Sequence, residues 1–181
     1  MPVAGVVEER VTVPEAVEVR VEGDHLVVAS KTHTLRRTLS HPRVRIAREG
    51  DEVRIWSELA TKREKALVGA FAAHVRNMIV GVTQGFRYEM RIVYSHFPMK
   101  AAPKGEDFII ENFLGEKYPR KARILGGTKV EVSGDQVILT GPDVEAVSQT
   151  AANIERATRI RGFDSRVFQD GIYITKKAAE A

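Results

Sequence analysis

The stretch "EGDEVRIWS" at residues 49–57 returns in slightly altered form as "SGDQVILTG" at residues 133–141. In both copies a Gly-Asp pair is flanked by residues that alternate between apolar and polar. Glycine readily adopts the positive φ that tight primed turns require, so this pattern is typical of a two-residue β-hairpin. A third copy, "EGDHLVVAS", occupies residues 22–30. The sequence therefore predicts three hairpins of half-buried antiparallel strands.

An amphipathic helix is predicted behind two of these hairpins. "REKALVGAFAAHVRNMI" (63–79) follows the 49–57 copy, and "PDVEAVSQTAANIERAT" (142–158) follows the 133–141 copy. Apolar residues recur at spacings of three and four in both segments. The predicted stripes are Leu67, Phe71, Val75, Met78 and Val82 in the first helix, and Val144, Val147, Ala151, Ile154 and Ala157 in the second. The 22–30 hairpin has no helix behind it and is assigned to the first unit, since Gly-Asp turns also recur by chance in β-rich chains.

Both predicted helices begin with recognisable capping signals. Thr61 with Glu64 three residues later forms a capping box. In the second helix, Gly141-Pro142-Asp143 places Pro142 at the first helical position and an acidic residue in the first turn.

A hairpin followed by a helix, written twice, predicts an internal duplication. We expect an α+β fold of two similar domains, each an antiparallel sheet with one packed α-helix. The expected domains are residues 1–82 and residues 83–181, the second carrying the main binding surface and a short C-terminal tail. Units of this size are large enough to bury a hydrophobic core.

Composition restricts the compartment and the partners. The 181 residues include no cysteine, which excludes disulfides and thiolate zinc sites and fits a reducing compartment. The first ten residues, "MPVAGVVEER", carry acids where a signal peptide needs basic residues before an apolar run. No stretch approaches the length expected of a membrane span. We therefore expect a cytoplasmic protein with no membrane partner.

Basic residues are clustered, although the formal net charge is only +4. Three segments contribute: residues 30–48 with Lys31, Arg36, Arg37, Arg43, Arg45 and Arg48 and no acid, residues 117–129 with five Lys or Arg, and residues 156–166 with Arg156, Arg159, Arg161 and Arg166 against Asp164. Such clusters are typical of proteins that bind a phosphate backbone. Charge alone favours this interpretation and a merely solvated surface equally.

Catalytic and metal-binding patterns are sparse. The five histidines are not spaced i, i+4, "LGGTK" at 125–129 lacks the full phosphate-loop spacing, and no G-x-S-x-G sequence occurs. We therefore expect no enzyme activity, no cofactor, no metal and no small-molecule substrate, with catalytic groups assembled only by folding left as an open alternative.

Three longer stretches carry a resemblance. "NFLGEKYPRKARI" (112–124) and the segment from "TGPDVEAV" to "DGIYITKK" (140–177) resemble the C-terminal half of the large-subunit ribosomal protein L-six family in its archaeal form, and also its eukaryotic relative called L-nine. "IVGVTQGFRYEMRIVYSHFPM" (79–99) resembles the junction between that family's two domains. The chain departs from the bacterial branch, in which a "YKGKG" loop follows the second helix, because "RIRGFDSRVFQDG" (159–171) stands there instead.

The resemblance implies a structural protein that binds large-subunit rRNA near the sarcin–ricin loop and the base of the stalk, where translation factors dock. It implies neighbouring ribosomal proteins as further partners and no covalent chemistry. The expected rRNA-binding residues are Arg159, Arg161 and Arg166 after the second helix, Lys117, Arg120, Lys121 and Arg123 in "GEKYPRKAR", and Lys176 and Lys177 in the C-terminal segment.

Several alternatives stay open. A nonribosomal RNA- or protein-binding adaptor is the second hypothesis, and an unrecognised enzyme is the third. The basic 30–48 segment could contact RNA or another protein. Tyr118 and Phe163 could stack on unpaired bases or pack against their own domain.

Overall fold

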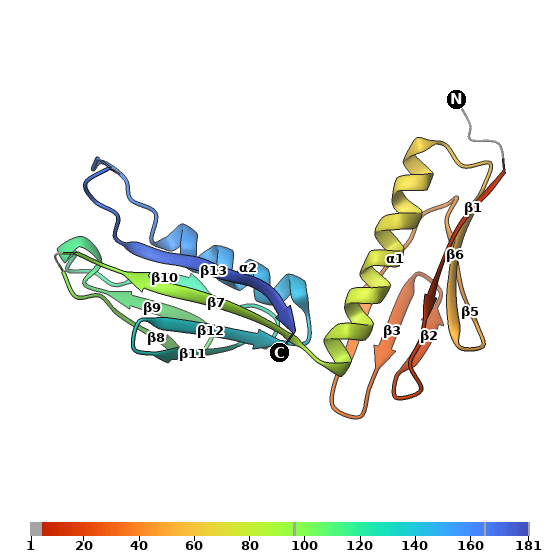
Figure 1. Cartoon of the computed structure of the whole chain (residues 1–181), viewed down its shortest axis with the longest axis horizontal. Coiled ribbons are helices and arrows are strands. Elements are labelled where there is room, and N and C mark those ends of the chain that lie inside the picture. Colours follow the sequence, from red (N-terminus) through yellow and green to blue (C-terminus); the bar gives the residue numbers. More distant parts are fainter. Residues whose placement is uncertain (1–4, 96, 165, 181) are drawn as a thin grey trace. The chain divides into compact units, whose positions relative to one another are not determined.

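The computed structural model describes residues 5–95, 97–164 and 166–180, and the chain divides into two compact units at Gln84 and Gly85 (Figure 1). Unit 1 contains β1 (Val6–Thr12), β2 (Glu18–Glu22), β3 (His25–Ala29), β4 (Thr34–Thr38), β5 (Arg45–Glu49), β6 (Glu52–Glu58) and α1 (Lys62–Thr83). Unit 2 contains β7 (Phe86–Val93), β8 (Lys100–Lys104), β9 (Asp107–Glu111), the 3₁₀ turn η1 (Phe113–Gly115), β10 (Arg120–Arg123), β11 (Lys129–Ser133), β12 (Gln136–Gly141), α2 (Val144–Ala157) and β13 (Gly171–Glu180).

Unit 1 packs α1 against two three-stranded antiparallel sheets, in the orders β1-β6-β5 and β2-β3-β4. The inward side chains Val53 and Ile55 of β6 are fully buried, as are Val68 and Val75 of α1. Four of the five residues of the predicted stripe are buried, and Leu67 is half-buried against the same core. The period of the apolar residues therefore identified the face of the helix that packs on the sheets.

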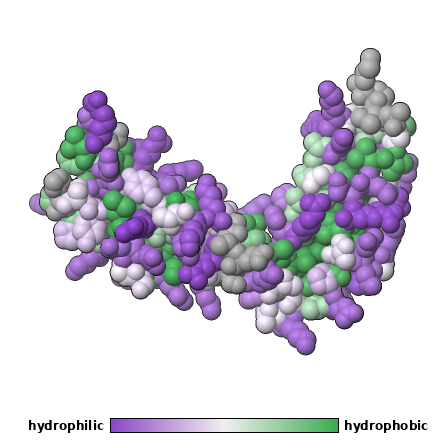
Figure 2. Space-filling view, viewed as in Figure 1, coloured by the Kyte–Doolittle hydropathy of each residue, from purple (hydrophilic) through white to green (hydrophobic). Residues whose placement is uncertain are grey.

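Unit 2 repeats this arrangement with α2, a four-stranded sheet of order β11-β12-β7-β13 and a three-stranded sheet of order β10-β9-β8. Val147 and Ile154 of α2 are fully buried, whereas Val144 and Ala157 at the helix ends are half-buried. All strand pairs are antiparallel, so the predicted α+β class is confirmed, with the strands of each unit divided between two sheets. Hydrophilic side chains cover most of the visible face of each unit (Figure 2).

The three predicted hairpins are confirmed as β2–β3, β5–β6 and β11–β12. The turn glycines Gly23, Gly50 and Gly134 have φ of 61°, 63° and 58°. The aspartates that follow do not have positive φ, which is the pattern of a type II′ turn. A fourth hairpin, β8–β9, turns at Gly105 with φ of 64° and was missed because glutamate replaces the aspartate.

The hairpin at residues 22–30 belongs to the duplicated unit. The backbone N–H of Leu39 donates to the carbonyl of Asp24 at 2.9 Å, and the N–H of Ile124 donates to the carbonyl of Glu106 at 2.8 Å. Each bond joins the residue after an edge strand to the second residue of a hairpin turn, so β2–β3–β4 corresponds to β8–β9–β10. The structural repeat therefore matches this hairpin to β8–β9, not to the other Gly-Asp hairpins, and it extends beyond the predicted hairpin and helix.

The start of α1 is as predicted, and the start of α2 is not. The Thr61 backbone N–H donates to a Glu64 carboxylate oxygen at 2.8 Å, and the Thr61 hydroxyl donates to the same oxygen. In the second helix, Pro142 is not the first helical residue. Asp143 is the N-cap and its carboxylate accepts from the N–H of Glu145 at 2.9 Å, so the helix begins at Val144 because the aspartate supplies the acceptor.

The capping box predicts a pH-dependent contribution to the stability of unit 1. Hydrogen bonds from Thr61 lower the pKa of Glu64. A lowered folded-state pKa stabilises the fold above the ordinary glutamate pKa of about 4.3, and the contribution is lost as the pH falls through the folded value. We expect Glu64→Gln to be less stable than the parent at pH 7 and the gap to close in acid, measured by urea denaturation with Trp56 fluorescence. A pH-independent gap would contradict this.

The prediction that no segment approaches a membrane span is wrong for α1 by length and composition, since this 22-residue helix is long and apolar enough to cross a bilayer. Its apolar stripe is instead buried against the two sheets of unit 1. A core helix of this length passes the same length criterion as a spanning helix, because both need a long apolar run.

Candidate nucleic-acid interface

The nine predicted rRNA-binding residues lie in three regions of unit 2. Lys117 lies between η1 and β10, β10 carries Arg120, Lys121 and Arg123, the connection from α2 to β13 carries Arg159, Arg161 and Arg166, and β13 carries Lys176 and Lys177. The structure joins two of these regions. Nη1 of Arg120 donates to the carbonyl of Ala157 at 2.8 Å and to that of Arg159 at 3.2 Å. The β10 cluster and the start of the 158–170 connection are therefore adjacent.

The guanidinium group of Arg120 is engaged by several groups of unit 2. Its Nε donates to Glu116 at 2.8 Å, which lowers the pKa of that carboxyl group. Its guanidinium carbon lies 4.1 Å from the ring centroid of Phe113. Because it also donates to the carbonyl of Ala157, the last residue of α2, and to that of Arg159 just beyond it, Arg120 fixes the end of the helix from which the 158–170 connection departs.

We expect Arg120→Gln to destabilise unit 2 by about 1–3 kcal/mol, because it leaves the Ala157 carbonyl and the Glu116 carboxylate without their donor. Urea denaturation followed by far-UV circular dichroism would measure the loss. The matched control is Lys121→Gln on the same strand, because the Lys121 side chain is exposed and makes no ion pair in the described part of the chain. Equal midpoints for the two variants would contradict a positioning role for Arg120.

Three other predicted residues have acidic partners. Arg166 donates from Nε and Nη2 to the two carboxylate oxygens of Asp164 at 3.1 and 2.9 Å, and this pairing lowers the pKa of Asp164. Arg123 lies 3.8 Å from Glu106, and Lys176 lies 3.2 Å from Glu89. The Arg123 and Arg166 side chains are highly exposed, so water screens their pairs and a stronger anion can replace the carboxylate.

The remaining candidates make no ion pair within residues 5–95, 97–164 and 166–180. They are Lys117, Lys121, Arg159, Arg161 and Lys177, and all are exposed. Arg156, in the last turn of α2, shares both properties and was not among the predicted site residues. The signal for it was present, because Arg156 lies in the same basic segment, 156–166, as the predicted Arg159 and Arg161. Arg156, Arg159 and Arg161 are thus three exposed arginines without ion pairs, close together in the chain, and the first two line one groove.

An open groove of about 690 Å³ lies beside this cluster. Its lining is Ala152, Glu155, Arg156, Thr158, Arg159, Ile160, Phe163, Phe168, Gln169 and Tyr173. The rings of Phe163 and Phe168 are 5.0 Å apart between centroids and tilted by 54°, and the Tyr173 hydroxyl donates to the carbonyl of Gln169 at 3.2 Å. Phe163 is 54 % exposed although it packs on Phe168. The groove therefore offers aromatic surface next to unpaired arginines.

The acid-free segment of unit 1 is more dispersed. Arg48 donates to the carbonyls of Val19 and Gly50 at 3.2 and 3.0 Å, and Arg43 lies 3.9 Å from Glu64. Lys31, Arg36 and Arg45 make no ion pair among the described residues, but they lie on separate strands or loops. The basic residues of the 30–48 segment are thus close in sequence but distributed over different strands and loops of unit 1.

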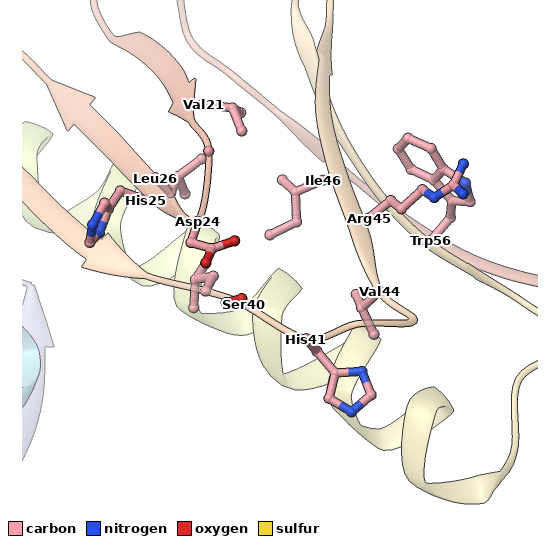
Figure 3. Close-up of a pocket in the computed structure, with 12 residues that line it drawn as sticks. Val21, Asp24, His25, Leu26, Ser40, His41, Val44, Arg45, Ile46 and Trp56 are labelled. Atoms are coloured by element: carbon pink, nitrogen blue, oxygen red, sulfur yellow. The ribbon is translucent and has the colours of Figure 1, made fainter.

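One arginine of this segment, Arg45, lines a cavity of about 420 Å³ in unit 1 (Figure 3). Leu26, Val44 and Ile46 give it apolar walls, and Arg45 lies beside Trp56 on the neighbouring strand. The carboxylate of Asp24 is also part of the lining. With one cation and one acid, this cavity lacks the excess of positive charge found around the unit 2 groove.

No group of three histidine or acidic side chains in the described part of the chain could hold a metal ion. The groove in unit 2 offers cationic and aromatic surface, an arrangement suited to binding anionic and planar groups.

Comparison with known proteins agrees with this chemistry. The family model described as "Ribosomal protein L6" matches residues 13–85 and 97–171, one segment in each unit. The chain is 47 % identical over 180 residues to the large ribosomal subunit protein uL6 of Methanococcus vannielii, covering 99 % of both proteins. It is 47 % identical over 168 residues to the protein of that name from Methanosarcina mazei, covering 93 % of this chain and 96 % of the relative. The chain therefore belongs to the ribosomal protein L6 family.

Proposed function

We propose that the chain, as a structural component of the large ribosomal subunit, binds large-subunit rRNA near the sarcin–ricin loop and the base of the stalk through unit 2. Family membership supports the place in the large subunit, because the two relatives are large-subunit proteins that match nearly the whole chain. The family consists of ribosomal proteins, so this chain is not an enzyme. Its partners are rRNA and neighbouring proteins of the subunit.

The observation that carries the site is the groove beside Arg156, Arg159 and Arg161. Arginine forks donate paired hydrogen bonds to phosphate oxygens, and each neutralised phosphate releases counterions. The nearby Phe163 and Tyr173 rings give unpaired bases an aromatic surface to stack on, which is a common mode of RNA recognition. Uncompensated guanidinium groups and exposed rings in one place fit RNA better than an acidic protein, which would use only the charges.

Lys117 and Lys121 add exposed positive charge near β10, although the Lys121 side chain points to the face of the strand opposite Arg120. Arg120 anchors the end of α2, so its contribution to binding is positional. Arg123 and Arg166 join the surface when phosphate replaces their exposed carboxylate partners, whereas Lys176 is paired with the half-buried Glu89. Lys177 lies on β13 beyond the groove.

A salt titration tests the proposal. We expect an rRNA fragment containing the sarcin–ricin loop and the stalk base to bind with log affinity that falls linearly with log salt, by about 0.7–0.9 per phosphate neutralised. The control is a fragment of equal length from another region of the large-subunit rRNA, which should bind more weakly at every salt concentration. Equal affinity for both fragments would contradict the location, and a salt-independent affinity would contradict phosphate binding.

A further inference from the structure

The two units differ at one edge of the sheet that packs on the helix. β1 of unit 1 corresponds to β7 of unit 2, because each is antiparallel to the second strand of a Gly-Asp hairpin. The Val13 backbone N–H donates to the carbonyl of Asp51 at 2.8 Å, and the Ile92 N–H donates to the carbonyl of Asp135 at 2.7 Å. These equivalent bonds align the two strands residue by residue, with Val13 at the position of Ile92.

Only unit 2 fills the outer edge of this strand. β13 pairs with β7 from Gly171 to Glu180, and Figure 1 shows it running alongside β7. In unit 1 the sheet ends at β1, and no strand of the described residues pairs with its outer edge. The strand position beside β7 is therefore filled by β13 in unit 2, whereas the equivalent position beside β1 is open in unit 1.

The backbone groups on the open edge can be identified from the aligned register. The partners of Arg87, Glu89 and Arg91 on β13 are Ala179, Lys176 and Tyr173. The Thr175 hydroxyl donates to the carbonyl of Glu89 at 3.0 Å, which confirms that this carbonyl faces β13. Neighbouring residues of an antiparallel strand point their backbone groups to opposite sides. The equivalent outward-facing residues of β1 are Glu8, Arg10 and Thr12.

The open edge has few of the features that protect edge strands. β1 pairs with β6 over seven consecutive residues with no register shift, and it contains neither proline nor glycine. Its charges are already compensated within unit 1. Glu8 lies 2.7 Å from Arg54, Glu9 lies 3.3 Å from Arg76, and Arg10 lies 3.3 Å from Glu8. An added strand would therefore leave no new unpaired charge at this edge.

The helix-facing side of the open position is partly apolar, and it also carries the exposed ion pair between Glu9 of β1 and Arg76 of α1. In unit 2, Ile172 of β13 is fully buried and Ile174 packs against the same core. In unit 1, Val7 of β1 and Leu67 of α1 are only half-buried at the edge of their core. An added strand with apolar residues at alternate positions would cover them as β13 covers the core of unit 2.

We propose that an extended segment of a neighbouring large-subunit protein adds to β1 as an antiparallel strand in the assembled subunit. The occupant is a polypeptide because alternating N–H and C=O groups at the spacing of a β-strand are complementary to another strand, whereas an RNA backbone presents mostly phosphate acceptors, with the 2′-hydroxyl as its only donor. The inference rests on the chain's place in the large subunit, but not on the rRNA site in unit 2.

Hydrogen exchange of the unmodified protein gives the direct test. In the isolated chain we expect the N–H groups of Val7, Glu9 and Val11, which face β6, to exchange slowly and those of Glu8, Arg10 and Thr12 to exchange fast. In purified large subunits we expect the second set to slow by about tenfold or more, as each gains a hydrogen bond. Unchanged exchange in subunits that contain the chain overturns the inference. Absence of the chain from the subunits overturns the proposed function instead.

Photo-crosslinking identifies what covers the edge. A benzophenone side chain at Thr12, in assembled subunits, should crosslink to one segment of one ribosomal protein, located by mass spectrometry. A crosslink to rRNA would overturn the proposal of a protein strand.

Proline substitution tests the backbone role. Arg10→Pro removes an outward N–H, which edge strands tolerate, so the isolated protein should remain folded. Subunits should then incorporate it less well than Arg10→Ala, which loses the same side chain but keeps the N–H. Equal incorporation of these two variants would overturn the inference.

Discussion

Replacing Val147 by aspartate is expected to unfold unit 2 while unit 1 stays folded. The Val147 side chain is fully buried on the face of α2 that packs on the sheets, and no cation lies in the core around it. Burying a carboxylate without a partner costs on the order of several kcal/mol, which approaches the whole stability of a small domain. Ile154→Asp, at an equally buried position about two turns further along the same stripe of α2, should have the same effect.

The only tryptophan makes this result easy to assign. Trp56 lies on β6 of unit 1, so its fluorescence follows unit 1, whereas far-UV circular dichroism follows both units. We expect the variant to lose the circular dichroism of unit 2 and to keep the urea midpoint of the Trp56 signal. Gln149→Asp, at an exposed position of α2, is the matched control and should change stability by less than about 1 kcal/mol. Simultaneous loss of both signals would mean that the units do not fold independently.

The second large effect is expected on RNA affinity. Exchanging Arg156, Arg159 and Arg161 together for glutamine should weaken binding of the sarcin–ricin fragment by at least about a hundredfold, because three charge-assisted hydrogen bonds of roughly 1 kcal/mol or more are removed. The three side chains are exposed and make no ion pair in the described part of the chain, so circular dichroism should not change. Gel-shift titration at one fixed salt concentration measures the loss.

A variant with the same loss of charge in unit 1 provides the control. Lys31, Arg36 and Arg45 are also without ion pairs among the described residues, and their exchange for glutamine lowers the net charge by the same amount. We expect the unit 1 variant to lose far less affinity, since its charges are dispersed and lack the aromatic groove. The reverse order would make the 30–48 segment the principal RNA contact and would contradict the site proposed in unit 2.

Local sequence patterns predicted most of the secondary structure for a physical reason. Turn glycines with positive φ, apolar residues at helical spacing and the Thr61–Glu64 capping box depend on residues within a few positions of one another. Errors arose where two local signals competed. Asp143 took the N-cap role from the expected start at Pro142, and Gly105-Glu106 formed a hairpin turn without an aspartate.

The sequence predicted which basic residues belong to the candidate site, but not which of them have bonding partners or which residues lie side by side on the surface. Sequence clustering cannot show which guanidinium groups are already bonded, because the partners are distant in the chain. Arg120 and the Ala157 carbonyl are separated by 37 positions, and only packing of β10 against α2 brings them together. The same packing places Phe168 and Tyr173 in the groove with Arg156, which no local pattern indicated.

The sequence by itself determined the repeated unit, its α+β class and the family, because these follow from local turn and helix signals and from residue identity along the chain. Only the tertiary structure decided which basic residues remain uncompensated and where β13 lies. That strand pairs with β7, some eighty residues earlier in the chain, and leaves the equivalent edge of β1 open. Strand pairing depends on backbone hydrogen bonds that every residue but proline can make, so the side-chain pattern of a strand does not specify its partner.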